Sequence, residues 1–192
     1  MSTDKHSRAL AALDDSSWDT RLKEGLSYEE QLINALRVEA ANYPGAVSII
    51  PIGKTRRGKD ECYYLGREND DLWNNPIPDL MVCAPPKQPL WIEVTSCYNF
   101  FELENSPDSR VVGLPHEKYC KVIQAGHDLS GNPGTGVMVV LVSRSELDQW
   151  TWFWPGDLNR EKNSRDYHNI VVAAPGGIED LAREILMTLE HN

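Results

Sequence analysis

The sequence predicts an α/β fold in which a mixed central sheet is flanked by helices. Two observations predict it: amphipathic helical segments are interspersed with short β-branched runs, and "GVMVVLVS" (136–143) has the apolar composition of a buried strand. The order is helix, three strands, helix, strand, and then a C-terminal extension, which describes a sheet with helices packed on it. With 192 residues the chain is the size of one domain, which we place at 25–192, after an N-terminal arm at 1–24 that we expect to be flexible.

The first predicted helix covers about residues 28–42. Ser27 and Glu30 have the S-x-x-E spacing of a capping box, and apolar residues then recur at helical intervals. The turn-forming "NYPG" is expected to end the helix. A helix with one apolar stripe is therefore expected to cover one face of the sheet.

Three strands and one shorter candidate are predicted in the first half of the chain. "AVSIIPI" (46–52) is β-branched, and "ECYYL" (61–65) is a shorter candidate. "PDLMVCA" (78–84) and "LWIEVTS" (90–96) are joined by the turn-like "PPKQP" and are predicted to form a hairpin. We expect residues 98–114 to be irregular.

The second half begins with a helix, "PHEKYCKVIQAG", in which Pro115 suits the first position and Gly126 is expected to close it. The apolar strand at 136–143 follows, and we expect it to be central in the sheet. "WTWFW" (150–154) and "NIVVAAP" (169–175) are further strands, and "GIEDLAREILMTLEH" is an amphipathic closing helix.

Composition excludes several classes of function. The formal net charge of −10 argues against broad, charge-driven binding to nucleic acid or to anionic membranes, so a nucleic-acid role would need a local basic patch and bound cations. No apolar run approaches the roughly 20 residues of a membrane helix, and no signal peptide is recognisable, so we expect a cytoplasmic protein without a membrane partner. The four cysteines are widely spaced and are expected to be reduced.

Three carboxylates point to a metal site. Asp79 begins one strand of the predicted hairpin, and Glu93 lies near the end of the next, so the two side chains are expected to converge. On a helical wheel Glu29 falls on the core-facing stripe of the first helix, whereas Glu30 falls on the wet face. An ionised carboxylate among apolar residues is costly unless it is paired or binds a metal, and oxygen ligands suit Mg²⁺ or Mn²⁺.

These residues resemble the PD-(D/E)xK superfamily of restriction-endonuclease-like nucleases. The resemblance rests on Pro78-Asp79, on Glu93-x-Thr95 and on the inward-facing Glu29, and it covers roughly residues 25–143 in element order. It implies a restriction-endonuclease-like α-β-β-β-α-β core and hydrolysis of phosphodiester bonds in DNA or RNA. It also implies that Asp79 and Glu93 bind Mg²⁺ or Mn²⁺ and that Glu29 assists.

The chain departs from the family at Thr95, where the pattern has a lysine. A threonine hydroxyl supplies no positive charge to the nucleophile or to the transition state. The E-x-T variant is similar in site layout to the cap-snatching endonucleases of segmented negative-strand RNA viruses, in which the following helix supplies the lysine. The resemblance thus assigns that role to Lys118 or Lys121, and the helical wheel favours Lys118 because it borders the apolar stripe.

Two further features have both a functional and a structural interpretation. In the loop "KTRRGK", the four cations Lys54, Arg56, Arg57 and Lys59 would grip a phosphate backbone, or they form a solvated hairpin tip. Alternation places the tryptophans of "WTWFW" on one strand face, which would stack bases, form sheet core or make a homodimer contact.

Three alternatives to the metal-dependent endonuclease remain at this level. One is a catalytically inactive nuclease-fold protein that binds nucleic acid or a protein partner, and Thr95 favours it. Another is an unrelated protein-interaction domain that uses the tryptophan face. The last is a Cys97 nucleophile paired with His116 or His127, for which no second spacing signal exists.

Overall fold

The computed structural model describes most of the chain, namely residues 15–52, 55–56, 62–64, 67–68, 78–97, 100–103, 106–132, 134–145, 148–157 and 167–191. The helical elements are α2 (Asp15–Ala40), α3 (His116–Ser130), α4 (Ile178–His191) and the 3-10 helix η2 (Pro155–Asp157). The strands are β1 (Ser48–Pro51), β2 (Thr55–Arg56), β3 (Cys62–Tyr64), β4 (Arg67–Glu68), β5 (Leu80–Cys83), β6 (Leu90–Cys97), β7 (Phe101–Leu103), β8 (Ser106–Pro115), β9 (Val137–Ser143), β10 (Trp150–Phe153) and β11 (Tyr167–Ala173).

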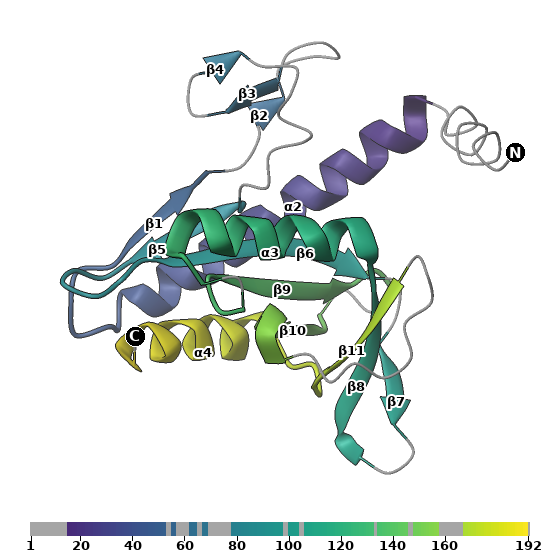
Figure 1. The fold of residues 1–192 in the computed structure, drawn as a ribbon. Helices are drawn as coiled ribbons and strands as arrows, with labels where there is room; N and C mark the ends of the chain where they lie inside the picture. The colour runs from purple at the N-terminus through teal and green to yellow at the C-terminus, as the bar shows by residue number, and fades with distance from the viewer. Residues whose placement is uncertain are drawn as a thin grey trace, which may run out of the picture.

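The main sheet has five strands in the order β1-β5-β6-β9-β10 (Figure 1). β5 pairs antiparallel with both β1 and β6, β6 pairs parallel with β9, and β9 pairs antiparallel with β10. β9 is buried along its whole length, as expected for an interior strand. The predicted α/β class, with a mixed sheet and flanking helices, is confirmed, and so is the β5–β6 hairpin.

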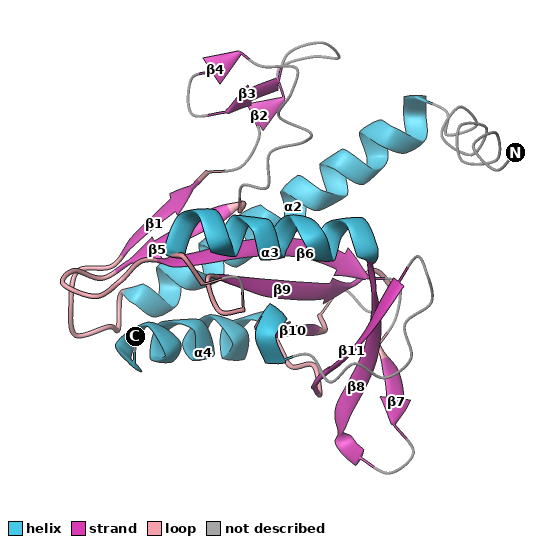
Figure 2. Ribbon diagram, in the orientation of Figure 1, coloured by secondary structure: helices cyan, strands magenta, loops and turns pink. Residues whose placement is uncertain are grey.

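Each face of the main sheet has its own core. On one face, α2 and α4 pack against alternate residues of β5, β6, β9 and β10, and this core includes Leu32, Leu36, Leu80 and Ile92. On the other face, α3 and strands β8 and β11 cover the opposite set, which includes Val139. Figure 2 shows α3 and α4 on different sides of the sheet. This sandwich leaves β6 in the middle of the sheet, with a helix-covered face on each side.

A second sheet, β11-β8-β7, contradicts the prediction that residues 98–114 are irregular. β8 pairs antiparallel with β11 from Tyr167↔Pro115 to Ala173↔Ser109. Val112 and Leu114 are buried on alternate positions of β8, which is the period of a strand. The strand was missed because Pro, Gly and charged residues interrupt its apolar pattern, and because its pairing partner lies more than 50 residues further along the chain.

The start of α2 predicted from a capping box and the end of α3 predicted from a glycine are both wrong. α2 begins at Asp15, so residues 15–24 of the predicted arm are helical and residues 1–14 lie outside the described part of the chain. Ser27 lies inside α2, where its Oγ accepts a hydrogen bond from Gln31 Nε2 at 3.2 Å, and therefore does not cap the helix. α3 continues past Gly126 to Ser130, and Gly131 ends it at φ 70°.

Gly126 lies at a close contact between α3 and the residue that precedes β9. A Cβ placed on Gly136 at the start of β9 would lie only 2.6 Å from the Gly126 Cα. The last turns of α3 and the entry to β9 therefore approach more closely than residues with side chains allow.

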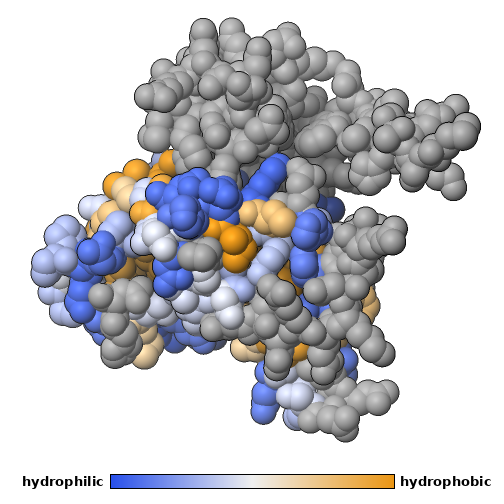
Figure 3. All heavy atoms as spheres, in the orientation of Figure 1, coloured by the Kyte–Doolittle hydropathy of each residue, from blue (hydrophilic) through white to orange (hydrophobic). Residues whose placement is uncertain are grey.

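The surface carries scattered apolar residues. The exposed large apolar side chains of the described part are Val38, Ile50, Phe101, Leu129 and Met187, and they belong to different elements. On the face shown in Figure 3, hydrophilic and apolar residues are interspersed. Within the ranges given above, no helix has the length and apolar character needed to span a bilayer.

Candidate metal centre

The β5–β6 hairpin brings Asp79 and Glu93 to the same place. Its register pairs Leu80 with Ile92, so the next pair outward in an antiparallel ladder is Asp79 opposite Glu93. Side chains at opposed positions point to the same face, here the one that α3 covers. The backbone N–H of Val94 also donates a hydrogen bond to Asp79 Oδ2 at 2.8 Å. The hairpin therefore fixes the Asp79 carboxylate next to Glu93.

α3 supplies a cation to this pair. Lys118, one turn into α3, forms an ion pair with Glu93 through Nζ and Oε1. The Glu93 side chain is only 13% exposed and that of Lys118 is 30% exposed, so the ion pair is largely withdrawn from water. Of the two lysines suggested by the sequence, Lys118 is thus the one that contacts Glu93.

The first helix contributes the third carboxylate. Glu29 is partly buried on α2, one position beyond the core residue Tyr28. Its negative charge acts on Asp79 and on Lys118, so it lies within electrostatic range of both. The helical wheel predicts that Glu29 faces the core and that Glu30 faces solvent. The structure agrees, because Glu29 is partly buried and Glu30 is exposed.

The pKa values of Asp79 and Lys118 are both shifted by burial and by the neighbouring charges. Burial raises the pKa of Asp79 well above its ordinary value, and the negative charges of Glu93 and Glu29 raise it further. The Lys118 ammonium and the Val94 N–H oppose that shift only in part. Burial alone would lower the pKa of Lys118, but the carboxylates of Glu93 and Asp79 outweigh it and raise the pKa.

The charge balance of the site suits a divalent cation. Three carboxylates outnumber one ammonium, and the negative charges of Glu93 and Glu29 add to burial in raising the pKa of Asp79, so a cation beside Asp79 would be favourable. Carboxylate oxygens are also the donor type that Mg²⁺ and Mn²⁺ prefer. Among the described residues, however, no group of three or more His, Cys, Asp or Glu side chains already surrounds one metal position.

The other predicted site residues lie around or outside this cluster. Thr95 is partly buried two positions along β6, on the same strand face as Glu93. Lys121 lies one turn beyond Lys118 on α3. Of the predicted basic loop, Lys54, Arg57 and Lys59 lie outside the described residues, as does the Arg56 side chain, although the Arg56 backbone belongs to the small sheet β2-β3-β4.

The structure contradicts the Cys97 nucleophile and places the tryptophan face against the core. Cys97 is buried, its Sγ lies 3.5 Å from the Val142 carbonyl oxygen, and burial raises the pKa of its thiol to about 11. Such a thiol stays protonated and is not a nucleophile at neutral pH. Trp150 is buried, and Trp152 and Trp154 are partly buried against the core formed with α2 and α4, which favours the sheet-core interpretation of these side chains.

Sequence reasoning missed one contributor, the Val94 N–H. Its role depends on the hairpin register, which directs a backbone donor in the middle of β6 toward the first side chain before β5. The Pro-rich turn and the 14-residue separation of Asp79 and Glu93 are the signals that could have predicted this register.

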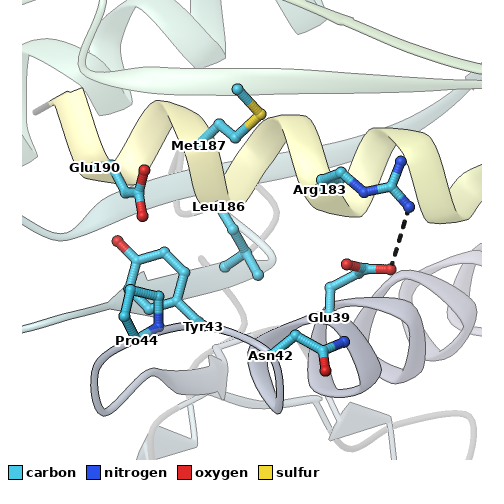
Figure 4. A pocket seen from close by; sticks show the side chains of 8 residues that line it. All are labelled: Glu39, Asn42, Tyr43, Pro44, Arg183, Leu186, Met187 and Glu190. Atoms are coloured by element: carbon cyan, nitrogen blue, oxygen red, sulfur yellow. Dashed lines mark ion pairs between the residues drawn. The ribbon is translucent and has the colours of Figure 1, made fainter.

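A shallow groove of about 160 Å³ lies elsewhere, between the end of α2 and α4. Tyr43, Leu186 and Met187 line it, and an ion pair between Arg183 and Glu39 spans it at 3.6 Å (Figure 4). Glu39 lies ten residues after Glu29, about 15 Å along a helix, so the groove is separate from the carboxylate cluster.

Glu29, Asp79, Glu93 and Lys118 are therefore the residues through which a function can be assigned to this chain. Their arrangement has to be judged by its own chemistry, because no family model, no curated protein and no solved structure matches the chain.

Proposed function

We propose that this chain is a Mg²⁺- or Mn²⁺-dependent endonuclease that hydrolyses phosphodiester bonds in DNA or RNA. One observation carries the proposal: carboxylates from α2, β6 and the residue before β5 share a single electrostatic environment with a lysine from α3. A structural ion pair needs one acid and one base. Three acidic groups beside one basic group leave excess negative charge, which a divalent cation would neutralise.

The order of elements supports a restriction-endonuclease-like core. Along the chain, α2, β1, β5, β6, α3 and β9 follow one another in the α-β-β-β-α-β order that the family resemblance implies. The small sheet β2-β3-β4 is inserted between β1 and β5, and the strands β7 and β8 are inserted between β6 and α3. Both insertions leave the Asp79–Glu93 hairpin and the α3 lysine in place.

Each of the four residues would have its own role in the reaction. Asp79 and Glu93 would hold the metal, with Glu29 as a third carboxylate on the side of α2. A bound Mg²⁺ or Mn²⁺ would acidify a water and neutralise charge that develops on the phosphate. The raised pKa of Lys118 keeps its ammonium protonated at neutral pH, so Lys118 acts as a cation that orients the nucleophile or stabilises the transition state and not as the general base.

Lys118 thereby supplies the charge that Thr95 lacks. In the family pattern the lysine stands two residues after the second carboxylate, on the same strand. In this chain the ammonium comes from α3 and contacts Glu93 directly, while Thr95 offers a neutral hydroxyl. The positive charge is thus kept in the site although its position in the sequence has moved.

A second candidate function is a catalytically inactive nuclease-fold protein that binds nucleic acid or a protein partner. It is favoured by the same ion pair, because Lys118 already neutralises Glu93, the carboxylate that a metal would need. The net charge of −10 also disfavours a strong general attraction to nucleic acid.

Cleavage assays test the proposal. The full chain is incubated with labelled single-stranded DNA, double-stranded DNA and RNA, in Mn²⁺, in Mg²⁺ or in a chelator. We expect metal-dependent internal cleavage that falls at least about 100-fold in Glu93→Gln and in Asp79→Asn, since each substitution removes a charged ligand. Glu102→Gln is the matched control, because Glu102 is an exposed glutamate on β7 that forms an ion pair with Arg110, and this variant should cleave at the wild-type rate.

The two candidates differ in one further measurement, Mn²⁺ calorimetry. Binding heat that disappears in Asp79→Asn, together with cleavage, supports the endonuclease. Binding heat without cleavage of any of the three substrates leaves the inactive protein as the better description. A Glu93→Gln protein that cleaves at full rate would eliminate the proposed site.

A further inference from the structure

Three side chains at the start of α3 are linked one to the next. His116 Nδ1 and His168 Nε2 are 2.6 Å apart, although the two residues are 52 positions apart in the sequence. The other ring nitrogen of His116, Nε2, lies 3.4 Å from Cys120 Sγ, whereas Nδ1 is 4.0 Å from that sulfur. His116 therefore joins a thiol through one nitrogen to an imidazole through the other. We call Cys120, His116 and His168 the thiol relay.

The fold places the thiol relay by two independent means. His116 and Cys120 are four residues apart on α3, so their side chains lie on one helix face. The β8–β11 register pairs His168 with Leu114, which places His168 beside the point where β8 becomes α3. The ring of Tyr119 packs against that of His168 at a centroid distance of 4.4 Å and restricts its orientation.

The connectivity of the thiol relay is that of an activated nucleophile. In such sites an adjacent base takes the proton of the nucleophile, and a third group orients the base. When His116 carries its proton on Nδ1, that N–H donates a hydrogen bond to His168 Nε2. His116 Nε2 is then an acceptor that faces the Cys120 thiol. The geometry thus makes Cys120 the nucleophile, His116 the base and His168 the positioning residue.

The surroundings of Cys120 differ from those of the other two thiols that the structure describes. Cys97 is buried, and burial raises the pKa of its thiol to about 11. Cys83 is partly buried, and burial raises the pKa of that thiol as well. Cys120 and His116 are both exposed, so a reagent in solution reaches the sulfur and the base together. Accessible thiols beside a basic group are the reactive ones in proteins.

The thiol relay is separate from the carboxylate site. Lys118 stands two residues from both His116 and Cys120, which is about 200° around a helix, so it points to the other side of α3. Lys118 contacts Glu93, whereas His116 contacts His168 of β11. The relay uses none of the residues of the candidate metal centre, so its chemistry is measurable in a chelator.

We propose that Cys120 is a reactive thiol that forms mixed disulfides with soluble low-molecular-weight disulfides, with His116 as its base. Cys120 gives its proton to His116 Nε2, and the thiolate attacks one sulfur of the disulfide. The new Sγ–S bond forms as the old S–S bond breaks, and the electron pair leaves on the second sulfur. That departing thiolate takes the proton from His116. One protein thiol and one disulfide thus give one mixed disulfide and one free thiol.

Oxidised glutathione is the probe for the experiment. The full chain is incubated with an excess of it in a chelator at pH 7, and peptide mapping by mass spectrometry follows the adduct on each cysteine. The mapping includes Cys62, whose side chain lies outside the described residues. The same incubation in urea that unfolds the chain gives the rate of an unassisted Cys120 thiol. We expect Cys120 to react at least about 10-fold faster in the folded chain than in urea.

Variants of the base test its role. His116→Gln should slow the modification of Cys120 at least about 10-fold, because an amide does not take up the thiol proton. An unassisted thiol loses reactivity steadily as the pH falls below about 8.5, since only the thiolate attacks. Between about pH 8 and pH 6.5 the wild-type rate should therefore fall less steeply than that of His116→Gln.

His168 is tested by loss and rescue. His168→Ala removes the acceptor that holds His116 Nδ1, so it should slow the reaction and make its pH dependence resemble that of His116→Gln. His168→Gln offers an amide oxygen as acceptor and should restore most of the rate. A loss of folding alone would not be rescued in this way.

A matched control lies in the same helix. His127→Gln removes another exposed α3 histidine, whose Nδ1 contacts Asp128, and it should leave the rate at Cys120 unchanged. Thermal melts followed by circular dichroism establish that each variant is folded before it is incubated.

Two results would overturn the inference. One is a folded wild-type chain in which Cys120 reacts no faster than it does in urea. The other is a His116→Gln protein that keeps both the wild-type rate and the wild-type pH dependence. Neither result bears on the endonuclease, because the incubation contains no free metal.

Discussion

At the scale of single residues, the carboxylate cluster is held by one cation. Lys118 compensates Glu93 directly and Asp79 at longer range, and the Val94 N–H adds a neutral donor to Asp79. Burial, followed by the negative charges of Glu93 and Glu29, still raises the pKa of Asp79 well above its ordinary value. Perturbed carboxylates of this kind are typical of functional sites, although ion-pair networks also produce them.

Removing the Lys118 charge should destabilise the protein. Lys118→Met leaves the nearly buried Glu93 carboxylate without its partner, and we expect a loss of about 2–4 kcal/mol in the free energy of unfolding. This loss is toward the lower end of the cost of breaking a buried ion pair, because 30% of the Lys118 side chain is exposed. Urea denaturation at pH 7 measures the loss, with Lys121→Met as the control expected to lose less than about 1 kcal/mol. Equal losses in the two variants would contradict the role given to Lys118.

Asp79 should make stability fall as the pH rises. Its folded-state pKa lies above the unfolded value of 3.8, so the folded protein keeps the proton longer than the unfolded chain does. The stability that this protonation contributes is full below about pH 4 and is lost as the pH rises through the folded pKa. In a chelator at pH 7, Asp79→Asn should therefore be more stable than the wild type, because the neutral amide avoids burying a charge and its oxygen still accepts from the Val94 N–H.

Chelator melts from pH 4 to pH 8 check that expectation. The difference between Asp79→Asn and the wild type should grow with pH, and about 2–4 °C in Tm corresponds to each kcal/mol. Asp108→Asn changes an exposed residue of β8 and is the control. Its Tm should depend on pH as that of the wild type does. If Asp79→Asn were the less stable protein at pH 7 in chelator, the assignment of a raised pKa to Asp79 would be wrong.

At the scale of elements, α3 is fixed at both ends by backbone features. Pro115 precedes its first turn, and Gly131 ends it in the left-handed region at φ 70°. Beyond Gly131 the chain turns sharply and enters β9 beside the last turns of the helix. A Cβ on Gly136 would lie 2.5 Å from the Asn132 carbonyl oxygen and 2.6 Å from the Gly126 Cα, so this junction has no room for a side chain.

Gly136→Ala should therefore be strongly destabilising. The contacting atoms include backbone, so relief requires α3 and β9 to separate, and we expect a loss of at least about 1–3 kcal/mol. Gly176→Ala is the matched control, because a Cβ there meets no atom within 4 Å, and it should change stability by less than about 1 kcal/mol. Thermal unfolding of the two variants in parallel decides the point, and similar melting temperatures would argue against the close approach.

At the scale of the whole molecule, the site draws its residues from the sheet and from the helices on both of its faces. α2 brings Glu29 from one face and α3 brings Lys118 from the other, while the hairpin in the sheet holds Asp79 and Glu93. The site therefore exists only when both layers are assembled. A metal that binds it should stabilise the folded state as a whole.

Mn²⁺ at about 100 times its dissociation constant should add about 2.7 kcal/mol to the free energy of unfolding. This gain should vanish in Glu93→Gln and persist in Glu102→Gln. Because the chain carries a net charge of −10, Na⁺ at matched ionic strength must be compared, since general screening also changes stability. An equal gain from Na⁺ and Mn²⁺ would show that no specific site is filled.

Several features could be predicted from local sequence alone. The β5–β6 hairpin, the apolar strand β9 and the closing helix α4 follow from periodicity and turn residues within a few positions of each other. The same local patterns placed Asp79 and Glu93 on paired strands and distinguished Glu29 from Glu30. Lys118 was preferred over Lys121 on a helical wheel, and it is Lys118 that contacts Glu93.

Only the tertiary structure decided the remaining features, because they depend on partners far along the chain. β8 is a strand because β11 supplies its hydrogen bonds, and α3 passes Gly126 and ends at Ser130, before the left-handed Gly131. Trp150 of β10 is buried and Trp152 is partly buried because α2 and α4 cover that face. The proximity of His116 to His168 likewise has no local signal. Periodicity and capping act over a few residues, whereas strand pairing and side-chain convergence are determined by the packing of the whole fold.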